Sequence, residues 1–135
     1  MTATATEGRV MNFRVSNITF DCENVLTMVE FWSTVLGRPM DEVSSDAFAS
    51  IGGSDVKRSE PAWYFNKIEE VKNAKNRVHL DLMNPDVAAV DELIGLGATV
   101  VSRADWGFHG WTVMKDPEGN EFCVASQTYE DKEKS

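Results

Sequence analysis

Hydrophobic residues change their spacing along the first 40 positions in a way that predicts a strand followed by a helix. Val15, Ile18 and Phe20 belong to a β-prone run that starts near residue 11. From about Glu23 the spacing becomes helical, and Gly37 stands where a helix C-terminal glycine is expected. The residues on the apolar face of this helix are Val25, Met28, Val29, Trp32 and Leu36. Further strands are expected over 38–43, 47–51 and 62–68.

The same order of elements is predicted again in the second half. Val78, Leu80 and Leu82 alternate with polar residues, which indicates a strand. Asn84-Pro85 is typical of a helix start, with Asn as the N-cap and Pro at the first helical position. Gly97 is expected to end this helix, whose apolar positions are Val87, Val90, Leu93 and Ile94. Three strands are expected to follow, over 98–102, 110–114 and 121–125.

The spacing of the two halves indicates a duplicated unit. Leu36-Gly37 and Leu96-Gly97 both close a helix and lie 60 residues apart (97 − 37). Asn17 precedes its glycine by 20 residues and His79 precedes its own by 18, so the two first strands overlay. The predicted organisation is one globular domain over 12–126. Its parts are a flexible N-terminus (1–11), a first βαβββ module (12–69), a second βαβββ module (76–126) and a polar tail (127–135).

Composition and charge restrict the function. The net charge is −9, and Lys and Arg do not cluster in the sequence, which argues against nucleic acid and against an anionic membrane surface. No apolar run reaches the length of about 18 residues that a membrane helix needs, and the first nine residues do not resemble a signal peptide. Two cysteines without a CxxC pattern favour free thiols, so we expect a cytoplasmic protein.

Three segments resemble a known superfamily. They are Asn76-Arg77-Val78-His79-Leu80-Asp81-Leu82, Gly97-Ala98-Thr99-Val100-Val101, and His109-Gly110-Trp111-Thr112-Val113-Met114 followed by Asp116-Pro117-Glu118-Gly119-Asn120-Glu121-Phe122-Cys123. Together they resemble the glyoxalase-like, bleomycin-resistance-like branch of the vicinal oxygen chelate superfamily over about residues 12–126. The resemblance implies an α+β fold in which two βαβββ modules form a curved mixed sheet, a half-barrel cup with its helices outside. It also implies a small-molecule ligand in the cup and a homodimer.

The resemblance further implies a divalent metal held by side chains on the first and last strands of each module. His79 stands at one such position, but Asn17 stands at the equivalent one and Cys123 replaces an expected glutamate. We therefore predict no cofactor and no metal. The alternative is a divalent Zn, Ni, Fe or Mn ion held by His79 and Glu121.

Strand alternation nominates the residues of the ligand site. If His79 faces the cup, Asp81 faces it too, and Glu121 and Cys123 face it from the last strand. The predicted catalytic residues are His79, Asp81 and Glu121. The predicted ligand-binding residues are Asn17, Trp63, Phe65, Trp106, His109, Trp111 and Cys123.

Four functions remain open at this point, and the concave site argues against one of them, a purely structural interaction domain. The leading hypothesis is a glyoxalase-like binding protein, or a weak, metal-independent enzyme, that accepts a small aromatic or planar metabolite. The first alternative is a metal-dependent lyase or isomerase of the vicinal oxygen chelate type. The second is a drug-sequestering antibiotic-resistance protein.

Overall fold

A computed structural model describes residues 10–42, 44–84, 86, 88–106 and 109–125, of which 104–106 and 109 are described by their backbone alone. Residues 1–9 of the predicted N-terminal segment (1–11) and the whole predicted polar tail (127–135) lie outside the described residues. The elements follow the order β1 (Asn17–Cys22), α1 (Val25–Leu36), β2 (Phe48–Ile51), β3 (Ala62–Lys67), β4 (Leu80–Met83), α2 (Ala89–Leu96), β5 (Thr99–Trp106), β6 (His109–Lys115) and β7 (Glu121–Ala125).

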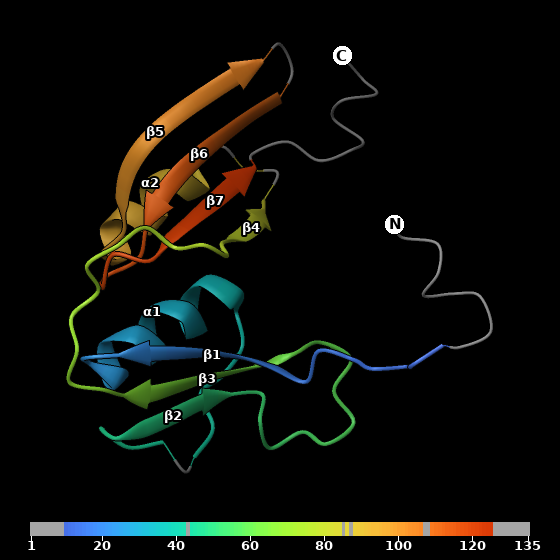
Figure 1. Cartoon of the computed structure of the whole chain (residues 1–135). Coiled ribbons are helices and arrows are strands. Elements are labelled where there is room, and N and C mark those ends of the chain that lie inside the picture. Colours follow the sequence, from blue (N-terminus) through green and yellow to red (C-terminus); the bar gives the residue numbers. More distant parts are fainter. Residues whose placement is uncertain (1–9, 43, 85, 87, 107–108, 126–135) are drawn as a thin grey trace.

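The strands form two curved sheets of equivalent topology (Figure 1). The first sheet has the order β1-β3-β2, and the second has the order β4-β7-β6-β5. In each sheet the first strand of the module pairs in parallel with its last strand, β1 with β3 and β4 with β7. The predicted α+β class with two repeated modules is confirmed.

Helix α1 has a capping residue at each end, and its C-terminal one is the predicted Gly37. Asn24 is the N-cap, and its side-chain oxygen accepts a hydrogen bond from the backbone N–H of Thr27 at 3.1 Å. Gly37 ends the helix with φ 65°, a left-handed conformation that glycine adopts without a steric penalty. Gly97 is the equivalent C-cap residue of α2 in the second module, with a positive φ of 120°.

The predicted start of the second helix at Asn84-Pro85 is wrong. Asn84 accepts a hydrogen bond from the N–H of Asp86 at 2.9 Å, and Asp86 accepts one from the N–H of Ala88 at 2.9 Å. These two short-range bonds form successive turns, and the helix begins only at Ala89. Pro85 itself lies outside the described residues.

The first module also departs from the expected strands. The β-prone run from residue 11 becomes a strand only at Asn17, and Val15 is 70% exposed. The strand expected over 38–43 is reduced to a single antiparallel bridge between Met40 and Ile51. Without a continuous partner for β2, the first sheet has three strands where the second has four.

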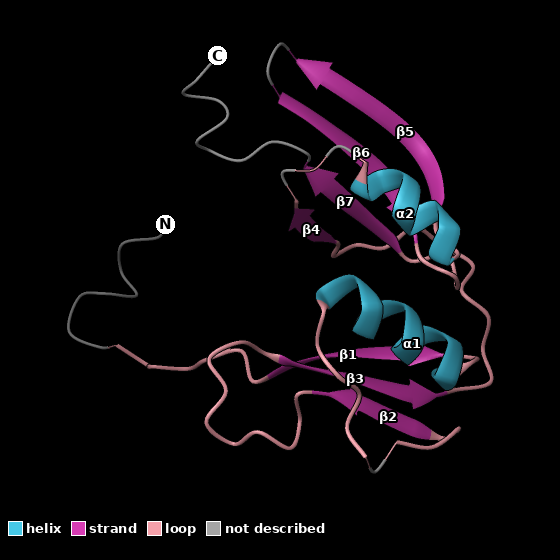
Figure 2. Ribbon diagram, turned by 180° about the vertical axis from the view of Figure 1, so that it is seen from behind, coloured by secondary structure: helices cyan, strands magenta, loops and turns pink. Residues whose placement is uncertain are grey.

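Helix α1 holds the two sheets together. The centroid of its Trp32 ring lies 5.0 Å from the ring centroid of Trp63 on β3 and 5.1 Å from that of Phe122 on β7. Figure 2 shows α1 in the space between the two sheets and α2 against one face of the second sheet. Among the described residues β1 and β4 share no backbone pairs, so the continuous half-barrel that we expected is instead two sheets joined by side-chain packing.

The β6–β7 turn of the second module reinforces this junction. The Glu118 carboxylate accepts hydrogen bonds from the backbone N–H groups of Glu23 and Asn24, at 2.8 and 2.6 Å. Such a carboxylate also interacts favourably with the helix dipole at the start of α1. The two modules therefore share both a core and a capping interaction.

Neither helix in the described part of the chain has the length and apolar character that a membrane span requires.

Candidate functional site

The second sheet separates its residues onto two faces as alternation predicts. Phe122 and Val124 are 1% and 3% exposed in the core, and Leu80 and Leu82 pack against it. The intervening Asp81 and Cys123 therefore point to the opposite, open face. Val78, which was expected in the same strand as Leu80 and Leu82, lies before β4 begins and is 82% exposed.

Three of the predicted site residues converge on this open face. The Nε2 atom of His79 lies 3.1 Å from Oδ1 of Asp81. Because Asp81 is the register partner of Cys123, the thiol belongs to the same group. One ligand atom from each of His79, Asp81 and Cys123 lies within 4.8 Å of the others. We refer to these three residues as the open-face cluster.

The electrostatics of the cluster keep its thiol protonated. Burial raises the pKa of Cys123, and the nearby charge of Asp81 and a hydrogen bond to that carboxylate raise it further. A thiol with a raised pKa is a poor nucleophile at neutral pH. Cys22, on β1, is a buried core residue whose pKa burial raises to about 12. Neither cysteine is therefore suited to nucleophilic catalysis.

Glu121 has a different environment from the one expected of a catalytic residue. Its carboxylate accepts a hydrogen bond from the backbone N–H of Asn76 at 3.0 Å and lies 3.3 Å from Nζ of Lys72. The bond from Asn76 lowers the pKa of Glu121. The side chain thus ties the linker between the modules to β7, and it is not part of the open-face cluster.

Trp63 and Phe65 lie on the opposite face of their sheet from the one expected. They are 6% and 0% exposed, and the Phe20 ring stacks on both at 5.7 and 5.4 Å. Their alternation is as predicted, but parallel pairing with β1 places them beside Ile18 and Phe20 on the α1 side. They are core residues, and the pocket wall that we expected them to form does not contain them.

The remaining predicted residues are distributed around the open faces. The Asn17 amide donates a hydrogen bond to Oγ1 of Thr19 at 2.8 Å on the first sheet. Trp111 is half-buried, and alternation with Val113, the partner of Cys123, places it on the open face of the second sheet. The side chains of Trp106 and His109 lie outside the described part of the chain.

A pocket of about 260 Å³ lies where β1 faces the segment before β4, and His79 is one of its walls. We call it the junction pocket. Its apolar walls are Ile18, Phe20, Trp32, Val78, Leu80 and Phe122, and its polar walls are Thr19, Asp21, Asn76, His79, Asn120 and Glu121. Of these walls the sequence nominated His79 and Glu121, and it did not nominate Asn76, Asn120, Phe20 or Trp32. Phe20 and Trp32 are apolar. Their apolar spacing indicated core packing, which they also perform.

A βαββ module and a βαβββ module, with a pocket of mixed polarity at their junction, form a glyoxalase-type α+β fold. The model of the glyoxalase-like domain family matches residues 17–125, and the chain belongs to this family. No curated protein matches the chain.

Solved structures of the same superfamily share the fold at low sequence identity. A glyoxalase/bleomycin resistance protein/dioxygenase family enzyme from Burkholderia phytofirmans is 19% identical with a TM-score of 0.61, covering 86% of this chain and 100% of the other. The fosfomycin resistance protein FosX from Mesorhizobium loti is 15% identical with a TM-score of 0.61, covering 92% and 98%. FosX from Listeria monocytogenes is 12% identical with a TM-score of 0.63, covering 90% and 98%. These similarities establish the fold alone.

Proposed function

We propose that this protein binds a small planar or aromatic molecule in the junction pocket and that it does so without a resident metal. The observation that carries the proposal is the composition of the pocket. The aromatic side chains of Phe20, Trp32 and Phe122 form part of the pocket wall, and the His79 imidazole lines the same pocket. Concave, largely apolar sites with a few placed polar groups are the usual form of small-molecule sites.

The size of the pocket restricts the ligand. A volume of about 260 Å³ lies just below the range of about 300–1,000 Å³ that is usual for drug-sized ligands. A single substituted ring therefore fits better than a larger metabolite. Aromatic walls favour a planar ligand, since stacked and edge-to-face ring contacts stabilise it beyond simple burial.

His79 supplies the polar contact and the only proton-transfer chemistry that we assign to the site. Its Nε2 lies 3.1 Å from Oδ1 of Asp81, which orients the ring. Its Nδ1 remains for the ligand. Such an imidazole can act as a weak general acid or base, because a ring nitrogen can accept or donate a proton. Asp81 in this scheme positions His79, and Cys123 stays a neutral thiol.

Replacing His79 with alanine should weaken ligand binding by about tenfold or more, the value of a hydrogen bond to a charged group. The measurement is ligand-observed NMR with phenol, benzoate and benzaldehyde, followed by titration of the best binder. Asp91→Ala, an exposed change on α2, is the matched control. Equal affinity of His79→Ala and wild type, or ligand-induced shifts far from β1 and β4, would contradict the proposal.

The open-face cluster favours a second candidate, a metal-dependent lyase or isomerase. His79, Asp81 and Cys123 offer nitrogen, oxygen and sulfur donors within 4.8 Å of one another, a set that suits a zinc-type ion. A bound ion there would act as a Lewis acid on vicinal oxygens of a substrate. Glu121, which we predicted as the partner of His79 in this alternative, is instead held by Asn76.

Metal analysis separates the two candidates. We expect less than one equivalent of metal in protein purified without chelator, because Asn17 and Cys123 stand where the family resemblance implies stronger metal ligands. Stoichiometric zinc that disappears in Cys123→Ser would favour the lyase or isomerase. A drug-sequestering role would use the same junction pocket. Two structural neighbours are fosfomycin resistance proteins, but at 12% and 15% identity they bear on the fold alone.

We also propose that the protein is a cytoplasmic homodimer. Exposed apolar residues along the segment before β1 support a partner. Met11 and Phe13 are 58% and 85% exposed, and a second copy could cover them. Light scattering at tens of micromolar should give twice the mass of 15.0 kDa. A monomer at that concentration would contradict the assignment.

A further inference from the structure

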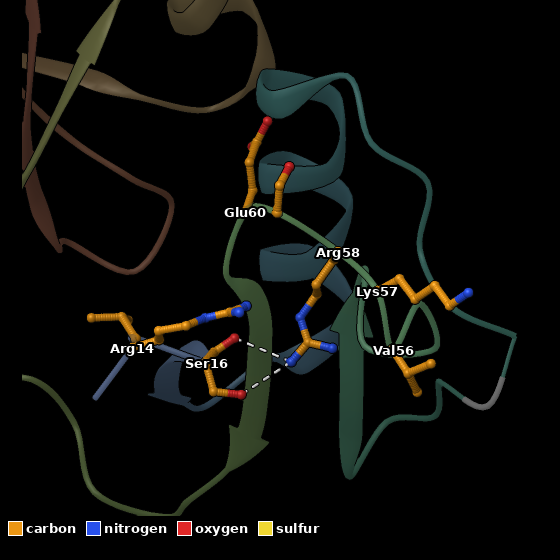
Figure 3. A pocket seen from close by; sticks show the side chains of 8 residues that line it. Arg14, Ser16, Val56, Lys57, Arg58 and Glu60 are labelled. Carbon is orange, nitrogen blue, oxygen red and sulfur yellow. Dashed lines mark hydrogen bonds between the residues drawn. The ribbon is translucent and has the colours of Figure 1, made fainter. Parts of the chain in front are cut away.

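A second cavity, remote in sequence from the open-face cluster, is rich in positive charge. It has a volume of about 920 Å³ and lies between the segment before β1 and the loop before β3 (Figure 3). Its lining residues are Arg14, Val15, Ser16, Val56, Lys57, Arg58, Ser59 and Glu60. We call it the basic cavity. Three cations gather here on a chain with 13 basic and 22 acidic residues, so the local charge is opposite to the net charge of −9.

These cations lack the carboxylate partners that surface cations often have. Within the part of the chain that the structure describes, none of Arg14, Lys57 and Arg58 forms an ion pair. Glu60, the one acid of the lining, lies instead 3.9 Å from Arg38. Three unpaired like charges around one cavity repel one another, and a bound anion would relieve that repulsion.

Arg58 is already held in a position to receive an anion. Its Nη2 donates to the carbonyl and hydroxyl oxygens of Ser16 at 3.1 and 3.2 Å (Figure 3). Its Nη1 donates to the carbonyl of Asp55 at 3.0 Å. These bonds use three of the five N–H donors of a guanidinium. The remaining Nε–H and one Nη1–H are free to bind an oxyanion, and a guanidinium fixed in advance loses less entropy on binding.

The other walls indicate that the anion is organic. Val15 and Val56 are 70% and 89% exposed, and both line the cavity beside the cations. Contact with a hydrocarbon part of a ligand would remove this apolar surface from water. We propose that the basic cavity is a binding site for a small organic anion that carries a phosphate or carboxylate group, with Arg58 and Arg14 contacting the anionic group. The site is separate from the junction pocket and does not depend on the function proposed for it.

The test is an NMR titration of ¹⁵N-labelled full-length protein with phenyl phosphate, benzoate and inorganic phosphate at constant ionic strength. Benzyl alcohol is the neutral control. We expect shifts at residues 14–16 and 55–60 with the organic anions, weaker shifts with inorganic phosphate and none with benzyl alcohol. Whichever of phenyl phosphate and benzoate binds more tightly shows whether the site prefers a phosphate or a carboxylate group.

Variants make the assignment specific. Arg14→Ala and Lys57→Ala should each weaken binding by about two- to fivefold, the range for exposed charge pairs. Arg58→Ala should abolish it, although it also removes the bonds to Ser16, so Arg58→Lys is included to retain the charge. Arg103→Ala, an exposed cation on β5, should leave binding unchanged. Equal weakening by Arg103→Ala, shifts at residues 14–16 and 55–60 with benzyl alcohol, or anion-induced shifts spread over the whole surface would each overturn the proposal.

Discussion

Replacing Trp32 with alanine is expected to lower the free energy of unfolding by about 3–5 kcal/mol, the usual cost of removing a buried Trp or Phe side chain. Trp32 is 1% exposed, and its ring lies between Trp63 of the first sheet and Phe122 of the second. The resulting cavity would lie between the modules, where neither sheet can collapse independently. The measurement is urea unfolding followed by circular dichroism.

Two further variants show which part of Trp32 matters. Trp32→Phe keeps most of the ring but removes the hydrogen bond from Nε1 to the Asp116 carboxylate at 3.2 Å, so a loss of about 1–3 kcal/mol is expected. Val56→Ala, at an 89% exposed position, should change stability by less than about 0.5 kcal/mol. A single transition in all variants is expected because the modules share one core. Two separate transitions would contradict a shared core.

The C-terminal ends of the two helices and the alternation along β4 and β7 could be predicted from the sequence because their causes are local. Gly37 and Gly97 end helices through their own backbone conformations, which depend on few neighbours. Alternation along β4 and β7 placed Asp81 and Cys123 together because strand geometry has a fixed period of two. Both signals are contained within a few residues of sequence.

Errors arose where the cause was distant in sequence. Alternation shows that Trp63 and Phe65 share a face, but only their pairing with β1, more than 40 residues earlier, determines which face that is. Glu121 is held by Asn76, 45 residues away, in a linker without regular structure. The basic cavity combines Arg14 with residues 56–60, and no periodic pattern links those two segments.

The shared core also depends on one buried carboxylate, Asp116, in the turn between β6 and β7. It is 3% exposed, and its oxygens accept hydrogen bonds from the N–H groups of Glu118 and Asn120 at 2.9 and 3.0 Å, as well as from the Trp32 indole. The Asn120 side chain donates to it too, at 3.0 Å. Through the bond from Trp32, this turn of the second module also binds the first module.

Asp116→Ala is therefore expected to lower the free energy of unfolding by about 3 kcal/mol, because buried donors on both modules lose their acceptor. Asp46→Ala, an exposed acid before β2, is the matched control and should change stability by less than about 0.5 kcal/mol. A loss no larger than that of the control would show that water satisfies these donors and that Asp116 does not join the modules.

The pH dependence of this effect has a defined sign. Burial raises the pKa of Asp116 above its ordinary value of 3.8, against the opposing effect of its hydrogen bonds. The folded state therefore binds the proton more tightly than the unfolded state, and the stabilisation from this proton is complete below pH 3.8 and lost as pH rises through the raised pKa. Asp116→Asn cannot titrate. The stability of wild type relative to Asp116→Asn should consequently fall between pH 3.5 and neutrality in parallel urea titrations, and a rise would mean that hydrogen bonds to the carboxylate outweigh its burial.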